Sequence, residues 1–172
     1  MTSRPDRTEA AAYYFTYIDQ VPPGEICGLL ESQGKETLEL LHGIPAETSL
    51  YRYGPGKWSI REVVNHLIDT ERLFVFRAFW FARGFESPLP SFDQGVAASA
   101  AMADDRSWPG LVEEFGAVRA ATLAFFRTLP AAAWTRRGIA SDNPFSVRAL
   151  AYIAVGHVIH HTAILRERYL HA

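Results

Sequence analysis

Two histidines near the C-terminus, His157 and His161, lie four residues apart in a segment rich in alanine, valine and isoleucine. If this segment is a helix, the two side chains lie on one face, about 6 Å apart, and can bind one metal ion. A third histidine, His66, lies far upstream in another segment with helical spacing. Three neutral imidazoles from two helices would hold a divalent metal and leave a coordination position open. Open positions are typical of catalytic rather than structural zinc sites.

The helical register of these histidines favours a site inside the protein. His157 and His161 share a face with apolar residues such as Ile153, and His66 shares one with Leu73. Imidazoles that face an apolar interior need polar partners, and a shared metal would satisfy them together. We therefore predict a metal site formed by His66, His157 and His161.

Two other histidines are open to other interpretations. His160 could chelate a metal with His157 at a spacing of three, but it shares its side of the helix with Glu167, so we expect it to be peripheral. His42 precedes Gly43 at a predicted helix end, where a favourable interaction with the helix dipole explains it.

Asp69 and Glu71 are close enough along the chain to His66 to orient its imidazole through the second ring nitrogen. The simpler alternative is that both carboxylates pair with Arg72 or its neighbours on a solvated face. Neither spacing nor composition identifies a general base.

Other catalytic patterns are missing from the sequence. It contains no His-Glu-x-x-His and no glycine-rich phosphate loop, and His66 and His157 are not part of di-iron type Glu-x-x-His motifs, because positions 63 and 154 are Val and Ala. No nucleophile elbow is recognisable, and nothing around Cys27 indicates an activated thiol.

The chemistry-bearing residues require helices to position them, and the sequence predicts four. Ser59 and Glu62 form a capping-box pattern, and Ser146 is a second candidate N-cap. Apolar spacing then predicts helices from Ser59 to about Gly84, from Ser146 to Tyr169 or Leu170, from Pro22 to Gly43 and from Ser107 to Pro130, with a short helix within Phe92–Ala103. With no convincing strand, the predicted fold is an all-α four-helix bundle with long connections around residues 44–58 and 85–106.

Composition indicates one globular domain over residues 1–172, of which 1–12 are expected to be flexible. Hydrophobic residues make up 48% and charged residues 21% of the chain. A net charge of −2 gives no indication of nucleic-acid binding. No uncharged apolar run approaches the ~18 residues of a membrane span, and a single cysteine, Cys27, fits the reducing cytoplasm.

Aromatic residues suggest an additional contact surface. The stretch Tyr13–Tyr17 and the helix carrying Phe74 to Phe81 have more apolar surface than one bundle face needs. Such an excess marks a homodimer interface or covers the mouth of the site.

The strings Tyr51-Arg-Tyr-Gly-Pro-Gly-Lys-Trp-Ser-Ile-Arg-Glu-Val-Val-Asn-His-Leu-Ile-Asp-Thr-Glu-Arg and Gly156-His-Val-Ile-His-His-Thr-Ala-Ile-Leu-Arg-Glu-Arg-Tyr-Leu resemble the DinB superfamily, particularly its YfiT-like branch. The resemblance covers the chain from about Tyr13 to Leu170. It implies a four-helix bundle, often dimeric, with a divalent metal held by histidines that match His66, His157 and His161. Asn65 departs from the small residue more usual beside the first ligand.

Zinc and nickel both occur in proteins of this family, and members of known activity are S-transferases or isomerases that use low-molecular-weight thiols. The YfiT-like branch is instead described as metal-dependent hydrolases. The resemblance therefore implies a metal-dependent enzyme acting on a small molecule, with or without a thiol. The alternative is a non-catalytic, stress-associated helical bundle in which the metal joins two helices.

Overall fold

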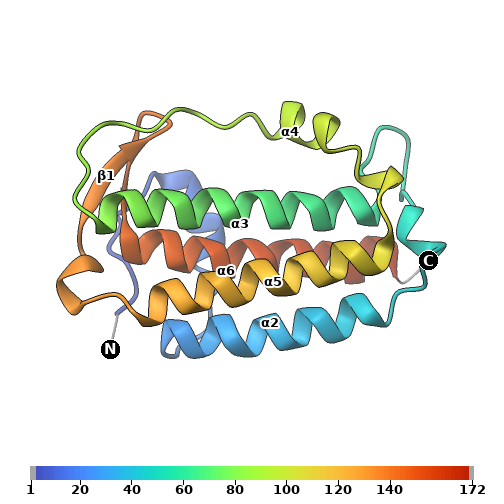
Figure 1. Ribbon diagram of the computed structural model, residues 1–172, viewed down its shortest axis with the longest axis horizontal. Coiled ribbons are helices and arrows are strands. Elements are labelled where there is room, and N and C mark those ends of the chain that lie inside the picture. Colours follow the sequence, from blue (N-terminus) through green and yellow to red (C-terminus); the bar gives the residue numbers. More distant parts are fainter. Residues whose placement is uncertain (1–2, 171–172) are drawn as a thin grey trace.

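The computed structural model describes residues 3–170 and shows four long helices packed side by side (Figure 1). They are α2 (Ile26–His42), α3 (Ile60–Ala82), α5 (Trp108–Arg127) and α6 (Val147–Ile164). Helix α3 packs against α5 and α6, and α2 completes the bundle on the other side. The four-helix bundle predicted from the sequence is confirmed.

The direction of the helices explains the longest connection. Helices α3 and α5 run the same way through the bundle, whereas α2 and α6 run the opposite way (Figure 1). A chain that leaves α3 must therefore return along the whole bundle before α5 can begin. Residues 83–107 make this return, and they include the predicted short helix as α4 (Gln94–Ala101).

The helix starts follow the capping residues in the sequence. Ser59 and Glu62 form both hydrogen bonds of a capping box at the start of α3. The hydroxyls of Ser107 and Ser146 accept backbone N–H bonds at the starts of α5 and α6. Helix α2 begins later than predicted because the Glu25 side chain is its N-cap. The carboxylate accepts hydrogen bonds from the backbone amides of Cys27 and Gly28.

The end of α6 continues as a π-helical turn over Leu165–Tyr169. Its last side chain is anchored, because the Tyr169 hydroxyl donates a hydrogen bond to the Trp58 carbonyl at 2.8 Å. The predicted helix end at Tyr169 is close to this position, whereas His171, which we expected to be a frayed tail, lies outside the described residues.

The expectation of no strands is wrong. Residues Arg137–Ala140 (β1) and Asn143–Ser146 (β2) form an antiparallel hairpin before α6. Its two-residue turn places Ser141 and Asp142 at φ of 50° and 58°, the left-handed pair of a tight hairpin. These residues lack the Asn-Gly or Asp-Gly signature of such turns, so the hairpin has only a weak signal in the sequence.

The N-terminal segment packs on the bundle from Arg4 onward, although we expected residues 1–12 to be flexible. Arg4 donates to backbone carbonyls at the end of α1 (Phe15–Ile18) and beyond it. Glu9 is buried and accepts hydrogen bonds from Arg148 and from the Ser146 hydroxyl. The segment is therefore attached to the first turn of α6; Met1 and Thr2 lie outside the described residues.

The Glu9 contact predicts a pH-dependent loss of stability. Burial raises the pKa of Glu9, but the bonds from Arg148 and Ser146 outweigh it and lower the pKa to about 2. A carboxyl with a lowered pKa stabilises the fold above its unfolded pKa of about 4.3, and this contribution disappears as the pH falls towards 2. Glu9→Gln should therefore lose about 3 kcal/mol at pH 7 but little at pH 2. Urea unfolding of the wild type and the variant across this pH range measures the loss of stability. The exposed Glu36→Gln serves as control. Equal losses of stability in both variants would contradict the role assigned to Glu9.

The buried apolar residues form two clusters that meet at the middle of α6. Val155 belongs to the cluster around α1 and the hairpin, and Val158 to the cluster around the start of α3. His157 lies between them in sequence, so the predicted site is at the junction of the two clusters. Within residues 3–170, no helix combines the length and apolarity that a bilayer span requires.

Candidate metal centre

The structure brings together the three histidines that the sequence predicted. One ring nitrogen from each of His66, His157 and His161 lies within 4.8 Å of the others. The ring centroids of His157 and His161 are 4.5 Å apart, and each lies 4.9 Å from that of His66. His66 and His157 are buried and His161 is half-buried. Helix α3 supplies the first ring and α6 the other two, as the helical register predicted.

The distance between the nitrogens of His66 and His157 fits a divalent metal. The Nε2 atoms of His66 and His157 are 3.1 Å apart. Two nitrogens each about 2.0–2.1 Å from a tetrahedral ion would be roughly 3.3 Å apart. The observed separation is close to this value, so a small adjustment would let both nitrogens bind one ion.

The three rings are held in the neutral form that a metal requires. Burial lowers the pKa of His66 to about 4. Burial, followed by the neighbouring His66 and His160, lowers the pKa of His161 to about 3. The pKa of His157 also lies well below its usual value, mainly because of burial. At neutral pH each ring therefore has a nitrogen lone pair available.

Thr70 contacts the cluster from one turn further along α3. Its hydroxyl donates to the His66 carbonyl at 2.6 Å, and its oxygen lies 3.3 Å from Nδ1 of His157. Because the hydroxyl proton points to the carbonyl, the Thr70 oxygen can accept from Nδ1–H of His157. That tautomer leaves Nε2 unprotonated and directed at His66. The sequence showed Thr70 on the correct face, but not this bond.

We expect Thr70→Val to weaken metal binding by about 10- to 100-fold, because the isosteric side chain cannot hold the His157 tautomer. Titration with a competing metal indicator measures the affinity. Thr162→Val is a matched control, since this buried α6 threonine donates only to backbone carbonyls. Thr70→Ser should restore affinity; wild-type affinity in Thr70→Val would remove the proposed role.

The two carboxylates considered as partners of His66 lie elsewhere. Asp69 accepts from the Asn65 amide at 2.8 Å and lies 3.7 Å from Arg72. Glu71 forms two hydrogen bonds with Arg119 of α5, at 2.9 and 2.7 Å, and both side chains are buried. The pairing alternative therefore describes Asp69, which lies beside Arg72, but not Glu71, whose partner is Arg119 in the core rather than a neighbour on a solvated face.

His160, His42 and Cys27 also lie outside the cluster. His160 is half-buried and packs against the Tyr17 ring, consistent with the peripheral place expected for it. His42 occupies the last turn of α2, as its position before Gly43 predicted. Cys27 is buried, and burial raises the pKa of its thiol to about 11, so it is not an activated nucleophile.

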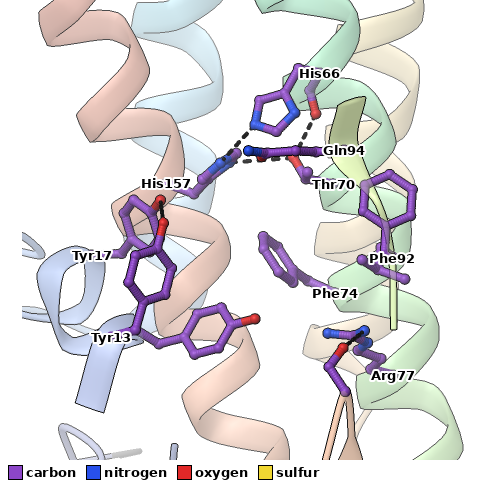
Figure 2. Close-up of a pocket in the computed structure, with 12 residues that line it drawn as sticks. Tyr13, Tyr17, His66, Thr70, Phe74, Arg77, Phe92, Gln94 and His157 are labelled. Carbon is purple, nitrogen blue, oxygen red and sulfur yellow. Dashed lines mark hydrogen bonds between the residues drawn. The ribbon is translucent and has the colours of Figure 1, made fainter. Parts of the chain in front are cut away.

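A cavity of about 120 Å³ opens beside the cluster (Figure 2). His66 and His157 lie at one end, and Phe74 and Phe92 also line the cavity. The N-terminal segment contributes Tyr13 and Tyr17 to the lining. The remaining lining residues are Tyr14, Thr70, Leu73, Arg77, Gln94 and Ser141. The long return segment thus contributes part of the wall, as a functional connection does.

Part of the excess aromatic surface lies at the cavity. Tyr13, Tyr14 and Tyr17 line the cavity, so these residues cover the site. On α3, Phe74 and Phe81 are buried, whereas Phe76 and Phe79 remain 47% and 38% exposed. Phe76 and Phe79 are therefore available on the surface, as is part of Tyr13, which is 63% exposed.

The sequence matches the family model described as the DinB superfamily over residues 29–165, a span that includes all three histidines. The chain belongs to the DinB superfamily. No curated protein matches the sequence.

Two solved structures share this DinB fold. YfiT from Bacillus subtilis, described as "a probable metal-dependent hydrolase with an unusual four-helix bundle topology", matches with a TM-score of 0.67 and 17% identity, covering 95% of this chain and 92% of that one. The mycothiol-dependent maleylpyruvate isomerase matches with a TM-score of 0.69 and 14% identity. That match covers 84% of this chain but 61% of the isomerase, which is therefore considerably longer.

Proposed function

We propose that this DinB protein is a divalent-metal-dependent enzyme that acts on a small molecule. The observation that carries the proposal is the convergence of three neutral histidines beside a cavity. His66, His157 and His161 are the proposed ligands, and Zn²⁺ or Ni²⁺ is the proposed ion because imidazole suits both. A bound ion would supply Lewis acidity, lowering the pKa of a water molecule or a thiol beside it.

The residues around the cluster have separate roles in this proposal. Thr70 orients His157 through Nδ1. The hydroxyls of Tyr13 and Tyr17, 2.8 Å apart, offer hydrogen bonds to a bound substrate. Phe74 and Phe92 would restrict water in the cavity that they line. Excluding water strengthens the polar interactions that remain in the site.

Thiol transfer is the reaction that the cavity favours. Among the described residues, no carboxylate lines the cavity, so no side chain there is suited to remove a proton from water. A thiol needs less assistance, because its usual pKa is about 8.5. The proposed co-substrate is therefore a low-molecular-weight thiol, in keeping with the mycothiol dependence of the similar isomerase. Hydrolysis, named for YfiT, is the second candidate.

The test begins with elemental analysis of protein purified without an affinity tag, which should contain about one Zn or Ni per chain. The metal-loaded protein is then assayed with a chromogenic electrophile, with and without mycothiol or bacillithiol. Turnover that requires the thiol supports the transferase. Cleavage of p-nitrophenyl esters without thiol supports the hydrolase, and a metal-free native protein contradicts both.

Two further features are proposed on separate grounds. We propose that two copies of the chain associate through the groove between α3 and α5, whose walls include Phe76, Phe79 and Phe125. An exposed apolar groove of this kind is a common self-association surface; sedimentation at the monomer mass would contradict it. We also propose a cytoplasmic location, because the single buried Cys27 fits a reducing compartment.

A further inference from the structure

Arg77 is a buried cation without an anionic partner. Arg77 is 2% exposed and has one of the largest fully buried side chains. Two other arginines that enter the core are neutralised, Arg119 by Glu71 and Arg148 by Glu9. Within residues 3–170, Arg77 has no carboxylate within ion-pairing distance. Burying an unpaired charge is unfavourable, so this exception calls for a function.

The contacts of Arg77 leave its charge and part of its hydrogen-bonding capacity free. Nη2 donates to the Pro90 carbonyl at 3.2 Å and to the Ser141 hydroxyl at 2.8 Å. Burial lowers the pKa of the guanidinium, and only the Tyr14 phenol opposes this. Nε is buried and has no hydrogen-bond partner among the described residues. The guanidinium carbon also lies 5.9 Å from the centroid of the Phe145 ring, and these neutral partners position the side chain without supplying a negative charge.

Arg77 and the metal cluster share one cavity. His66 and Arg77 are eleven positions apart on α3. An α-helix turns by about 100° and rises by about 1.5 Å per residue. The two residues therefore lie within roughly 20° of each other around the helix, on one face, and about 16 Å apart along its axis. Both line the cavity, and Figure 2 shows Phe74 between them, with His66 and His157 at one end and Arg77 at the other.

The cavity is therefore suited to an anion. Its described lining contains one guanidinium, neutral imidazoles and tyrosines, but no aspartate or glutamate. A divalent ion at the histidines would make it more positive still. Guanidinium binds carboxylates with directional, charge-assisted hydrogen bonds, and Nε is a donor that no group in the described residues uses, whereas Nη2 already donates to Pro90 and Ser141.

We propose that Arg77 binds the carboxylate of a small anionic substrate and so directs the other end of that molecule towards the histidine cluster. This inference rests on the proposed function and specifies its substrate class. The Phe74 and Phe92 side chains, which line the cavity, would contact the apolar part of the molecule between the two polar ends. A neutral analogue would leave the buried guanidinium unpaired and is rejected for that reason.

Calorimetric titration with acetate, succinate and adipate tests the proposal, with succinamide as the neutral analogue. The carboxylates, but not succinamide, should bind wild-type protein. Arg77→Gln should lower the carboxylate affinity at least tenfold while the metal content stays unchanged. Arg83→Gln, an exposed arginine on the turn after α3, is the matched control and should bind as wild type does. Equal binding by wild type and Arg77→Gln, or no carboxylate binding by wild type, would overturn the inference.

A second measurement covers the case in which Arg77→Gln fails to fold. The ¹⁵N resonance of Arg77 Nε, assigned by its absence in Arg77→Lys, should shift when succinate is added to wild-type protein. An unchanged resonance at saturating succinate would contradict direct binding. Both measurements are made with metal-loaded and metal-free protein. A protein that binds carboxylate through Arg77 but takes up no metal refutes the proposed function alone, whereas one that takes up metal but no carboxylate refutes this inference alone.

Discussion

Replacing His157 with alanine should lower the affinity for Zn²⁺ or Ni²⁺ by at least about a hundredfold and leave the bundle folded. Four-ligand zinc sites gain about 10–16 kcal/mol on binding, or roughly 3 kcal/mol per ligand. Since 1.4 kcal/mol corresponds to a factor of ten, losing one ligand costs two or more orders of magnitude. The imidazole is neutral, so its removal leaves no buried charge behind.

Metal content by mass spectrometry and the circular dichroism melting curve together measure this result. His160→Ala is the matched control, because this neighbouring ring is half-buried and lies outside the three-histidine cluster. It should retain stoichiometric metal. Full metal occupancy in His157→Ala would show that the ion, if present, binds elsewhere.

The same variant separates the enzyme from the non-catalytic alternative. In the described residues, α3 and α6 already pack along much of their length through apolar side chains, independently of the three rings. A metal that served mainly to join these helices would be needed for folding, and His157→Ala would then lose its cooperative melting transition. Retained melting together with lost metal favours the catalytic role.

The sequence predicted the positions of the three histidines because each lies in register with an apolar helical face. A period of 3.6 residues determines which side chains point into the core, and His66 and His157 follow that period with their apolar neighbours. Helix starts were also predictable, since Ser59, Ser107 and Ser146 act through bonds made within one turn. Local rules of this kind need no knowledge of the tertiary structure.

Features that depend on distant segments could not be predicted in this way. Thr70 and His157 meet only because α3 and α6 pack antiparallel, and Arg77 reaches Ser141 only once the hairpin has formed. The parallel course of α3 and α5 is set by the long return segment, whose path has no local signature. Glu71 illustrates the limit, because its partner Arg119 comes from another helix rather than from Arg72 next to it.

Gly156 marks another such long-range contact, where α1 crosses α6 most closely. A Cβ at this position would lie 2.1 Å from the Tyr17 carbonyl oxygen, a backbone atom that cannot rotate away. Gly156→Ala must therefore displace α1, whose Phe15 and Ile18 are buried. Overpacking of this kind costs about 3 kcal/mol, which lowers the Tm of a chain of this length by roughly 6–12 °C.

Gly116→Ala in α5 gives the opposite expectation and serves as the matched control. A Cβ there would meet Leu38 at an ordinary 3.5 Å, and alanine favours the helix by about 0.5–1 kcal/mol. Because Tyr17 packs against His157 at a ring distance of 5.2 Å, displacing α1 also opens the cavity beside the histidines. Hydrogen exchange in residues 12–20 should therefore rise in Gly156→Ala but not in Gly116→Ala. Unchanged exchange and melting in Gly156→Ala would mean that α1 does not rest on α6 in solution, and the cavity would then lose its tyrosine wall.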